Sequence, residues 1–129
     1  MRLLKSKKVT RFAFAGALLM TLFSGCEYDY ILTPPAPPIT EEVKFSTDII
    51  PIFNGGCNVS GCHATGAWDP DLTPANAYSS ITSLNLIDTV TPKNSILYKV
   101  MSTGSMKAYS TPDDANHVLA WITQGAKQN

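Results

Sequence analysis

Residues 57–63 read Cys57-Asn58-Val59-Ser60-Gly61-Cys62-His63, so that four residues separate two cysteines and a histidine directly follows the second. Thiols and imidazole form disulfides, bind transition metals and hold cofactors. The stretch therefore has three interpretations: a disulfide that happens to precede a histidine, a metal site, or a place of covalent cofactor attachment. The compartment of the protein and the fold of the remaining chain bear on the choice.

The first 26 residues indicate export. Basic side chains between positions 5 and 11 precede an apolar run of twelve residues, 12–23 (FAFAGALLMTLF). Because this run is too short to span a bilayer, it is typical of a signal peptide. It ends in LFSGC, which resembles a bacterial lipobox with Phe23 in place of the usual aliphatic residue. We therefore predict a lipoprotein signal peptide over 1–25 and lipidation at Cys26. An ordinary secretory signal is the alternative, and it also exports the chain.

Removal of the signal peptide changes the charge of the chain. Five of the ten basic side chains lie in residues 1–26, whereas all ten acidic ones follow, so the formal net charge of the mature chain is −5. An acidic surface argues against nucleic acid and anionic lipid as partners and mildly favours basic proteins.

Residues 26–43 are predicted to form a tether. Four prolines occupy positions 34, 35, 37 and 38. Such a run favours polyproline II at about 3.1 Å per residue, so the stretch reaches roughly 50 Å when extended. The folded domain is then expected over 44–129.

Helix signals dominate this domain. A first short helix is expected to carry Ile49, Ile50 and Phe53. It would be capped by Ser46 or Thr47, end at Gly55-Gly56, and be followed by a helix from Thr73-Pro74 to about Ser80 and by one over 96–102.

The last helix has the clearest start. Thr111-Pro112-Asp113-Asp114 offers a capping threonine, a proline at the first helical position and two acids favourable to the helix dipole. Val118, Trp121 and Ile122 then follow at helical spacing, and Gly125 can end the helix. No segment shows sustained alternation of apolar and polar residues, so the predicted fold is all-α. Its core is modest, and a large flat cofactor would complete it.

The three interpretations of residues 57–63 differ in how they use His63. A Cys57–Cys62 disulfide closes only a small loop and leaves His63 without a role. Zinc would need Cys57, Cys62, His63 and the distant His117, with adjacent ligands turning sharply to one ion. Covalent haem attachment uses all three residues together, because the thiols add to the vinyl groups and the adjacent imidazole ligates iron. The usual attachment motif has two residues between the cysteines, and Gly61 gives this longer loop conformational freedom.

Three segments resemble short bacterial monohaem cytochrome c domains. Residues 45–66 (FSTDIIPIFNGGCNVSGCHATG) look like their opening, 91–101 (TPKNSILYKVM) like their middle helix, and 106–126 (MKAYSTPDDANHVLAWITQGA) like their closing segment. The resemblance covers nearly all of residues 45–126 in the same order. It departs at Lys107-Ala108-Tyr109, where the family commonly has prolines, and at the four-residue spacer between the cysteines.

The resemblance implies a small cytochrome c-like helical domain around one haem c. It implies thioether bonds at Cys57 and Cys62, His63 as the proximal iron ligand and Met106 as the distal one. The residues themselves also favour Met106, which lies in a polar loop, over Met101, whose place on a helix stripe is better explained by core packing. Met101, no sixth ligand, or a loop anchor at Met106 remain alternatives.

The predicted function is one-electron transfer by a lipid-anchored carrier that is not an enzyme. We expect redox partner proteins, attachment to a membrane through lipid, and a place in the cell envelope of a Gram-negative bacterium, facing the periplasm or the cell surface. Motifs of hydrolases and kinases are missing from the sequence. The alternatives are a haem sensor or peroxidase-like domain with an open distal site, and a haemless lipoprotein with a Cys57–Cys62 disulfide that acts as a binding or structural module.

Three other side chains have expected positions. Trp68 either covers a haem edge or anchors its loop. His117 lies just off the apolar face of the last helix and is expected at the surface or an interface. Trp121 is expected to pack against Ile49, Ile50 or Phe53 where the first and last helices cross.

Overall fold

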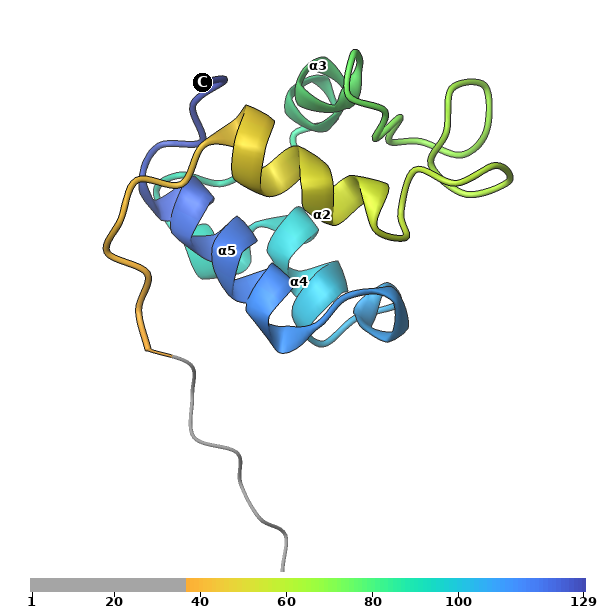
Figure 1. The fold of residues 1–129 in the computed structure, drawn as a ribbon. Coiled ribbons are helices and arrows are strands. Elements are labelled where there is room, and N and C mark those ends of the chain that lie inside the picture. Colours follow the sequence, from red (N-terminus) through yellow and green to blue (C-terminus); the bar gives the residue numbers. More distant parts are fainter. Residues whose placement is uncertain (1–36) are drawn as a thin grey trace, which may run out of the picture. The chain divides into compact units, whose positions relative to one another are not determined.

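The computed structural model describes residues 37–129, and these form a small all-α domain (Figure 1). Within this range there are four α-helices and no strand, which confirms the prediction of an all-α domain. The helices are α2 (Ile50–Asn54), α3 (Ala77–Ser83), α4 (Ile96–Ser102) and α5 (Pro112–Thr123). The predicted signal peptide, Cys26 and the first part of the tether lie outside the described residues. In the described part of the chain, no helix is long and apolar enough to cross a membrane.

Helix α5 begins and ends where the sequence predicts. The Thr111 hydroxyl accepts a hydrogen bond from the Asp114 N–H at 3.1 Å, and the Asp114 carboxylate accepts one from the Thr111 N–H at 2.8 Å. This reciprocal capping box, with Pro112 in the first turn, fixes the start of the helix. Val118, Trp121 and Ile122 are buried on one face.

The first helical segment begins differently from the prediction. A π-helical turn, Phe45–Ile49, leads directly into α2, and neither Ser46 nor Thr47 caps it. The Asp48 carboxylate instead accepts a hydrogen bond from the Lys44 N–H at 2.7 Å. The helical segment begins at Phe45. The Phe45 ring is buried and its N–H donates a hydrogen bond to the Asn129 side chain, so both groups hold this residue in place.

The predicted start of the second helix, at Thr73-Pro74, is wrong by about one turn. Asp71 accepts hydrogen bonds from the Thr73 N–H and hydroxyl and from the Asn76 side-chain amide. These bonds make 71–76 a turn centred on the Asp71 carboxylate, and α3 begins only at Ala77. Helix α4, by contrast, has the predicted bounds.

Aromatic side chains join the two ends of the domain in the core. The Phe45 ring lies 5.2 Å from the Trp121 ring and 5.3 Å from the Tyr78 ring, measured between centroids. The polar ends of Trp121 and Tyr78 donate hydrogen bonds to the backbone carbonyls of Lys127 and Ala126. The first helical segment and α5 therefore meet, and the aromatic partner of Trp121 is Phe45, which the sequence did not predict.

Residues 37–43, which the sequence analysis assigns to the tether, lie beside α5 (Figure 1). The Gln124 amide accepts a hydrogen bond from the Val43 N–H and donates one to the Glu41 carbonyl, both at 2.8 Å. Asn116 donates to the Pro37 carbonyl at 3.3 Å, and Ile39 packs against the core. This part of the chain is thus attached to the domain.

Candidate functional site

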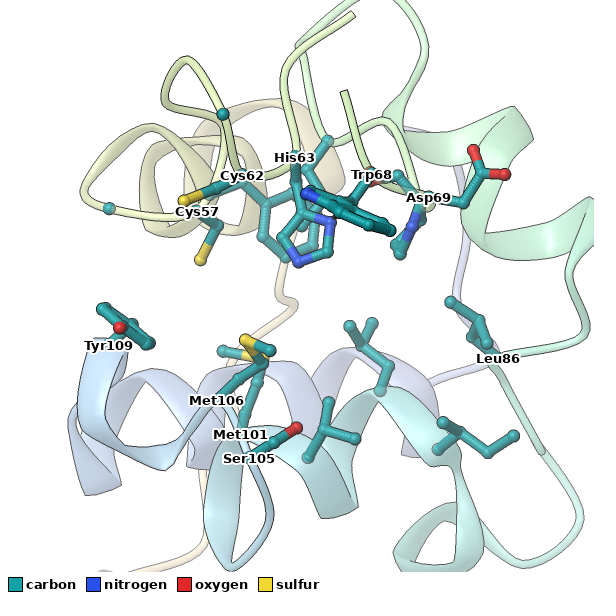
Figure 2. Close-up of a pocket in the computed structure, with 18 residues that line it drawn as sticks. Cys57, Cys62, His63, Trp68, Asp69, Leu86, Met101, Ser105, Met106 and Tyr109 are labelled. Atoms are coloured by element: carbon teal, nitrogen blue, oxygen red, sulfur yellow. Dashed lines mark hydrogen bonds between the residues drawn. The ribbon is translucent and has the colours of Figure 1, made fainter. Parts of the chain in front are cut away.

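A cavity of about 520 Å³ separates the Cys57–Leu72 segment from α4 and the loop that follows it. Figure 2 shows Cys57, Cys62 and His63 on one wall and Met101 and Met106 on the other. Most of the remaining lining is apolar and includes Phe53, Leu72, Leu86, Ile96, Leu97 and Val100. The structure therefore brings together the four residues predicted to hold a cofactor.

The loop from Cys57 to His63 closes on itself. The N–H groups of Cys57 and Asn58 donate to the Phe53 carbonyl, so the loop continues directly from α2. The His63 N–H then donates to the Cys57 carbonyl at 3.1 Å. Gly61 has a φ of +82°, a conformation that L side chains rarely adopt. The four-residue spacer thus forms a compact turn, and both thiols line the cavity.

The two thiols are unpaired in this structure. Burial raises the pKa of the half-buried Cys57 thiol, and the negative charges of Asp114 and Cys62 raise it further. A raised pKa keeps the thiol protonated near neutral pH.

The imidazole of His63 is held in one tautomer by the backbone. Its Nδ1 lies 3.0 Å from the Pro70 carbonyl oxygen and 3.2 Å from that of Trp68. Because carbonyl oxygens only accept hydrogen bonds, Nδ1 must carry a proton. In the neutral ring Nε2 then has a free lone pair, and Figure 2 shows the far edge of the ring pointing into the cavity. Histidines that bind metals typically use one ring nitrogen as the ligand while the other donates a hydrogen bond that fixes the ring, as Nδ1 does here.

The opposite wall carries two thioethers. Met106 is half-buried in the loop after α4, and its N–H donates to the Val100 carbonyl at 2.9 Å. Met101 is only 4% exposed and belongs to the core, as predicted, but it also lines the cavity. Core packing is therefore confirmed for Met101, and its place in the cavity wall keeps it as the alternative to Met106.

The zinc interpretation fails on geometry. The described residues contain no group of three or more histidine, cysteine, aspartate or glutamate side chains that could hold a metal ion. His117 is outside the cavity lining, and its Nδ1 bonds to the Asp113 carbonyl of its own helix at 3.0 Å. The proposed ligand set of Cys57, Cys62, His63 and His117 is therefore not assembled.

Trp68 lies at the mouth of the cavity and is 74% exposed. A side chain that is mostly in solvent does not anchor its loop by burial, so this alternative for Trp68 is wrong. The backbone carbonyl of Trp68 does contribute to the site, because it accepts a hydrogen bond from His63 Nδ1.

Comparison with protein-family models, curated proteins and solved structures finds no match for this chain.

Two contributors to the site were not found from the sequence. The Pro70 carbonyl orients His63, and the Ser110 hydroxyl lies 2.8 Å from the Met101 carbonyl oxygen and 3.3 Å from that of Met106. The Pro70 carbonyl and the acceptors of the Ser110 hydroxyl are backbone groups, so residue type gives little sign of these contacts.

Proposed function

We propose that this chain is a lipid-anchored electron carrier with one covalently bound haem c. The observation that carries the proposal is the arrangement of the cavity walls. His63, with a free Nε2, faces Met106 across an apolar space, and the wall of His63 also holds two unpaired thiols.

The residues present fit such a group in three respects. A flat, largely apolar ring system needs an apolar space between two walls, and the cavity provides one. His63 and Met106 lie on opposite walls of this cavity, so each would be placed to hold the iron from its own side. The thiols of Cys57 and Cys62 line the same cavity and are available to form thioether bonds.

The bound haem would supply one-electron redox chemistry, and the protein would tune it. The Pro70 carbonyl holds the His63 ring in position and makes Nε2 a better donor. The thioether of Met106 and the apolar lining favour the reduced state and so raise the potential. If His63 and Met106 both bind the iron, no coordination position would be open to a substrate, which favours a carrier over a sensor or peroxidase-like domain.

The rest of the chain supports a place near a membrane. Lipid on Cys26 and the following tether would keep the domain in the cell envelope of a Gram-negative bacterium, where redox proteins of the periplasm or cell surface can reach it. The acidic mature chain favours partners with basic contact surfaces.

The test uses the full-length chain, produced in a periplasm with haem-attachment factors and purified in detergent. We expect low-spin spectra in both redox states, and haem that stays with the polypeptide in acid and organic solvent. Mass spectrometry should show the increment of one haem. A double variant, Cys57→Ser with Cys62→Ser, should release the haem under the same treatment. A colourless wild-type chain, or one that has lost two hydrogens in a disulfide, would support the haemless lipoprotein instead.

A further inference from the structure

The wall opposite His63 presents two methionines where one distal ligand would suffice. Met101 and Met106 both line the cavity, and Figure 2 shows both side chains pointing towards the wall that carries His63. Thioether sulfur is a suitable ligand for haem iron from either position.

The two methionines differ in how firmly their backbones are held. Met106 follows Gly104 and Ser105 and precedes Lys107, and all three of these neighbours are exposed. Met101 is part of α4, is 4% exposed and belongs to the hydrophobic core. Exposed loops with few buried contacts open at lower free energy than packed helices. Release of Met106 would break the hydrogen bond from its N–H to the Val100 carbonyl, yet it should cost less free energy than displacement of Met101 from the packed helix.

Ser110 links the two positions. Its hydroxyl lies within hydrogen-bond distance of the carbonyl oxygens of both Met101 and Met106, at 2.8 and 3.3 Å. A hydroxyl has one proton to donate, so it serves mainly the nearer carbonyl. Movement of the Met106 loop would thus leave the stronger contact, to Met101, in place.

We propose that Met101 is a reserve distal ligand, which binds the iron when the loop releases Met106. The inference rests on the proposed function. The exchange replaces one iron–sulfur bond by another and leaves the oxidation state of the iron unchanged. Methionine has three rotatable side-chain bonds, so the sulfur of Met101 can move within the cavity without displacement of α4. The domain would then keep thioether ligation while the loop is open.

The experiment removes the methionines singly and together in the full-length haem-loaded chain. Iron-bound methionine is detected by its charge-transfer band in the oxidised state and by its shifted methyl resonance in reduced protein with isotope-labelled methionine methyls. In Met106→Ala we expect both signals to persist, with the methyl resonance moved. In Met101→Leu with Met106→Ala we expect both to vanish.

A matched control changes the packing of the same wall but keeps the sulfur of Met101. Leu97 lies on α4, is also 4% exposed and also lines the cavity, so Leu97→Val combined with Met106→Ala should keep the thioether signals. Their loss in Met106→Ala alone, with covalent haem still present and water or a lysine bound instead, would overturn the inference and leave the proposed function standing. Lack of covalent haem in the wild-type chain would overturn both.

Discussion

Val100 leaves no room for a side chain on Gly104. A Cβ atom at Gly104 would lie 2.8 Å from the Val100 Cα and 3.1 Å from the Lys99 carbonyl oxygen. The chain turns back tightly against the end of α4 at this point, with the Gly104 N–H donating to the Lys99 carbonyl at 2.9 Å. Two residues later the Met106 N–H donates to the Val100 carbonyl. The close approach of Gly104 to α4 thus sets where Met106 meets the cavity.

Gly104→Ala should therefore displace Met106 from the wall. Because the nearest atoms are backbone atoms that cannot rotate away, we expect a loss of about 1–3 kcal/mol in the free energy of unfolding. If Met106 binds the iron as proposed, its methyl resonance in the haem-loaded protein should also shift or disappear. Gly56→Ala is the control, since a Cβ there would meet the Tyr109 carbonyl oxygen at an ordinary 3.7 Å. An unchanged Met106 resonance in Gly104→Ala would show that the loop adapts without loss of ligation.

The two histidines of the chain should behave differently when replaced. His63→Ala removes the imidazole that faces the cavity, so the haem that remains attached should lose its low-spin spectrum, and added imidazole should restore it. His117→Ala should leave the spectrum as in the wild type, because His117 bonds within α5 and does not line the cavity. An optical titration with imidazole distinguishes the two variants, because only the spectrum of His63→Ala should change as imidazole is added. A low-spin His63→Ala protein without added imidazole would contradict the assignment.

Sequence reasoning located helices where the signal is local. Thr111, Pro112 and Asp114 satisfy one another within a single turn, so the start of α5 could be predicted. The predicted start of α3 was wrong because a side chain outside that helix determines where it begins. The Asp71 carboxylate bonds to Thr73 and Asn76 and delays α3, and nothing in the Thr-Pro pair at 73–74 shows that competition.

The candidate site shows the same division. The sequence predicts that Cys57, Cys62 and His63 lie together because they are close neighbours in the chain, and the structure places all three in one cavity lining. The roles of the Pro70 and Met101 backbone carbonyls depend on which segments fold together, and residue type does not encode this. For Met101 the helix stripe favours core packing and leaves iron ligation only as an alternative, because a stripe cannot distinguish the part that faces other helices from the part that faces a cavity.

Asp71 should make stability depend on pH in the acid range. Hydrogen bonds from the Thr73 hydroxyl and N–H, and then from Asn76, hold the pKa of the Asp71 carboxyl well below its ordinary value. A group whose pKa is lowered by folding stabilises the folded state above its unfolded pKa of about 4, and this contribution is lost as the pH falls further. Asp71→Asn should therefore flatten the loss of stability below about pH 4, as measured by urea unfolding at several pH values.

Two controls test the cause of this effect. Thr73→Val keeps the carboxylate and the shape of residue 73 but removes the hydroxyl donor, so it should raise the pKa of Asp71 and weaken the pH dependence in part. Asp69→Asn removes a neighbouring carboxylate that is exposed. It should change the loss of stability at acid pH less than Asp71→Asn does. Equal effects of Asp69→Asn and Asp71→Asn would assign the pH dependence to net charge rather than to the hydrogen bonds.

Gln124 should determine whether residues 37–43 stay on the domain. Its amide bonds to both Val43 and Glu41, and the removal of both bonds in Gln124→Ala should cost about 1–3 kcal/mol and speed proteolysis between residues 37 and 43. Gln128→Ala is the matched control, because Gln128 is exposed near the same end of the chain. Since neither Gln124 nor residues 37–43 line the cavity, the haem spectrum should be the same in both variants. Equal cleavage rates in the two variants would show that Ile39 and Asn116 hold the segment without the Gln124 hydrogen bonds.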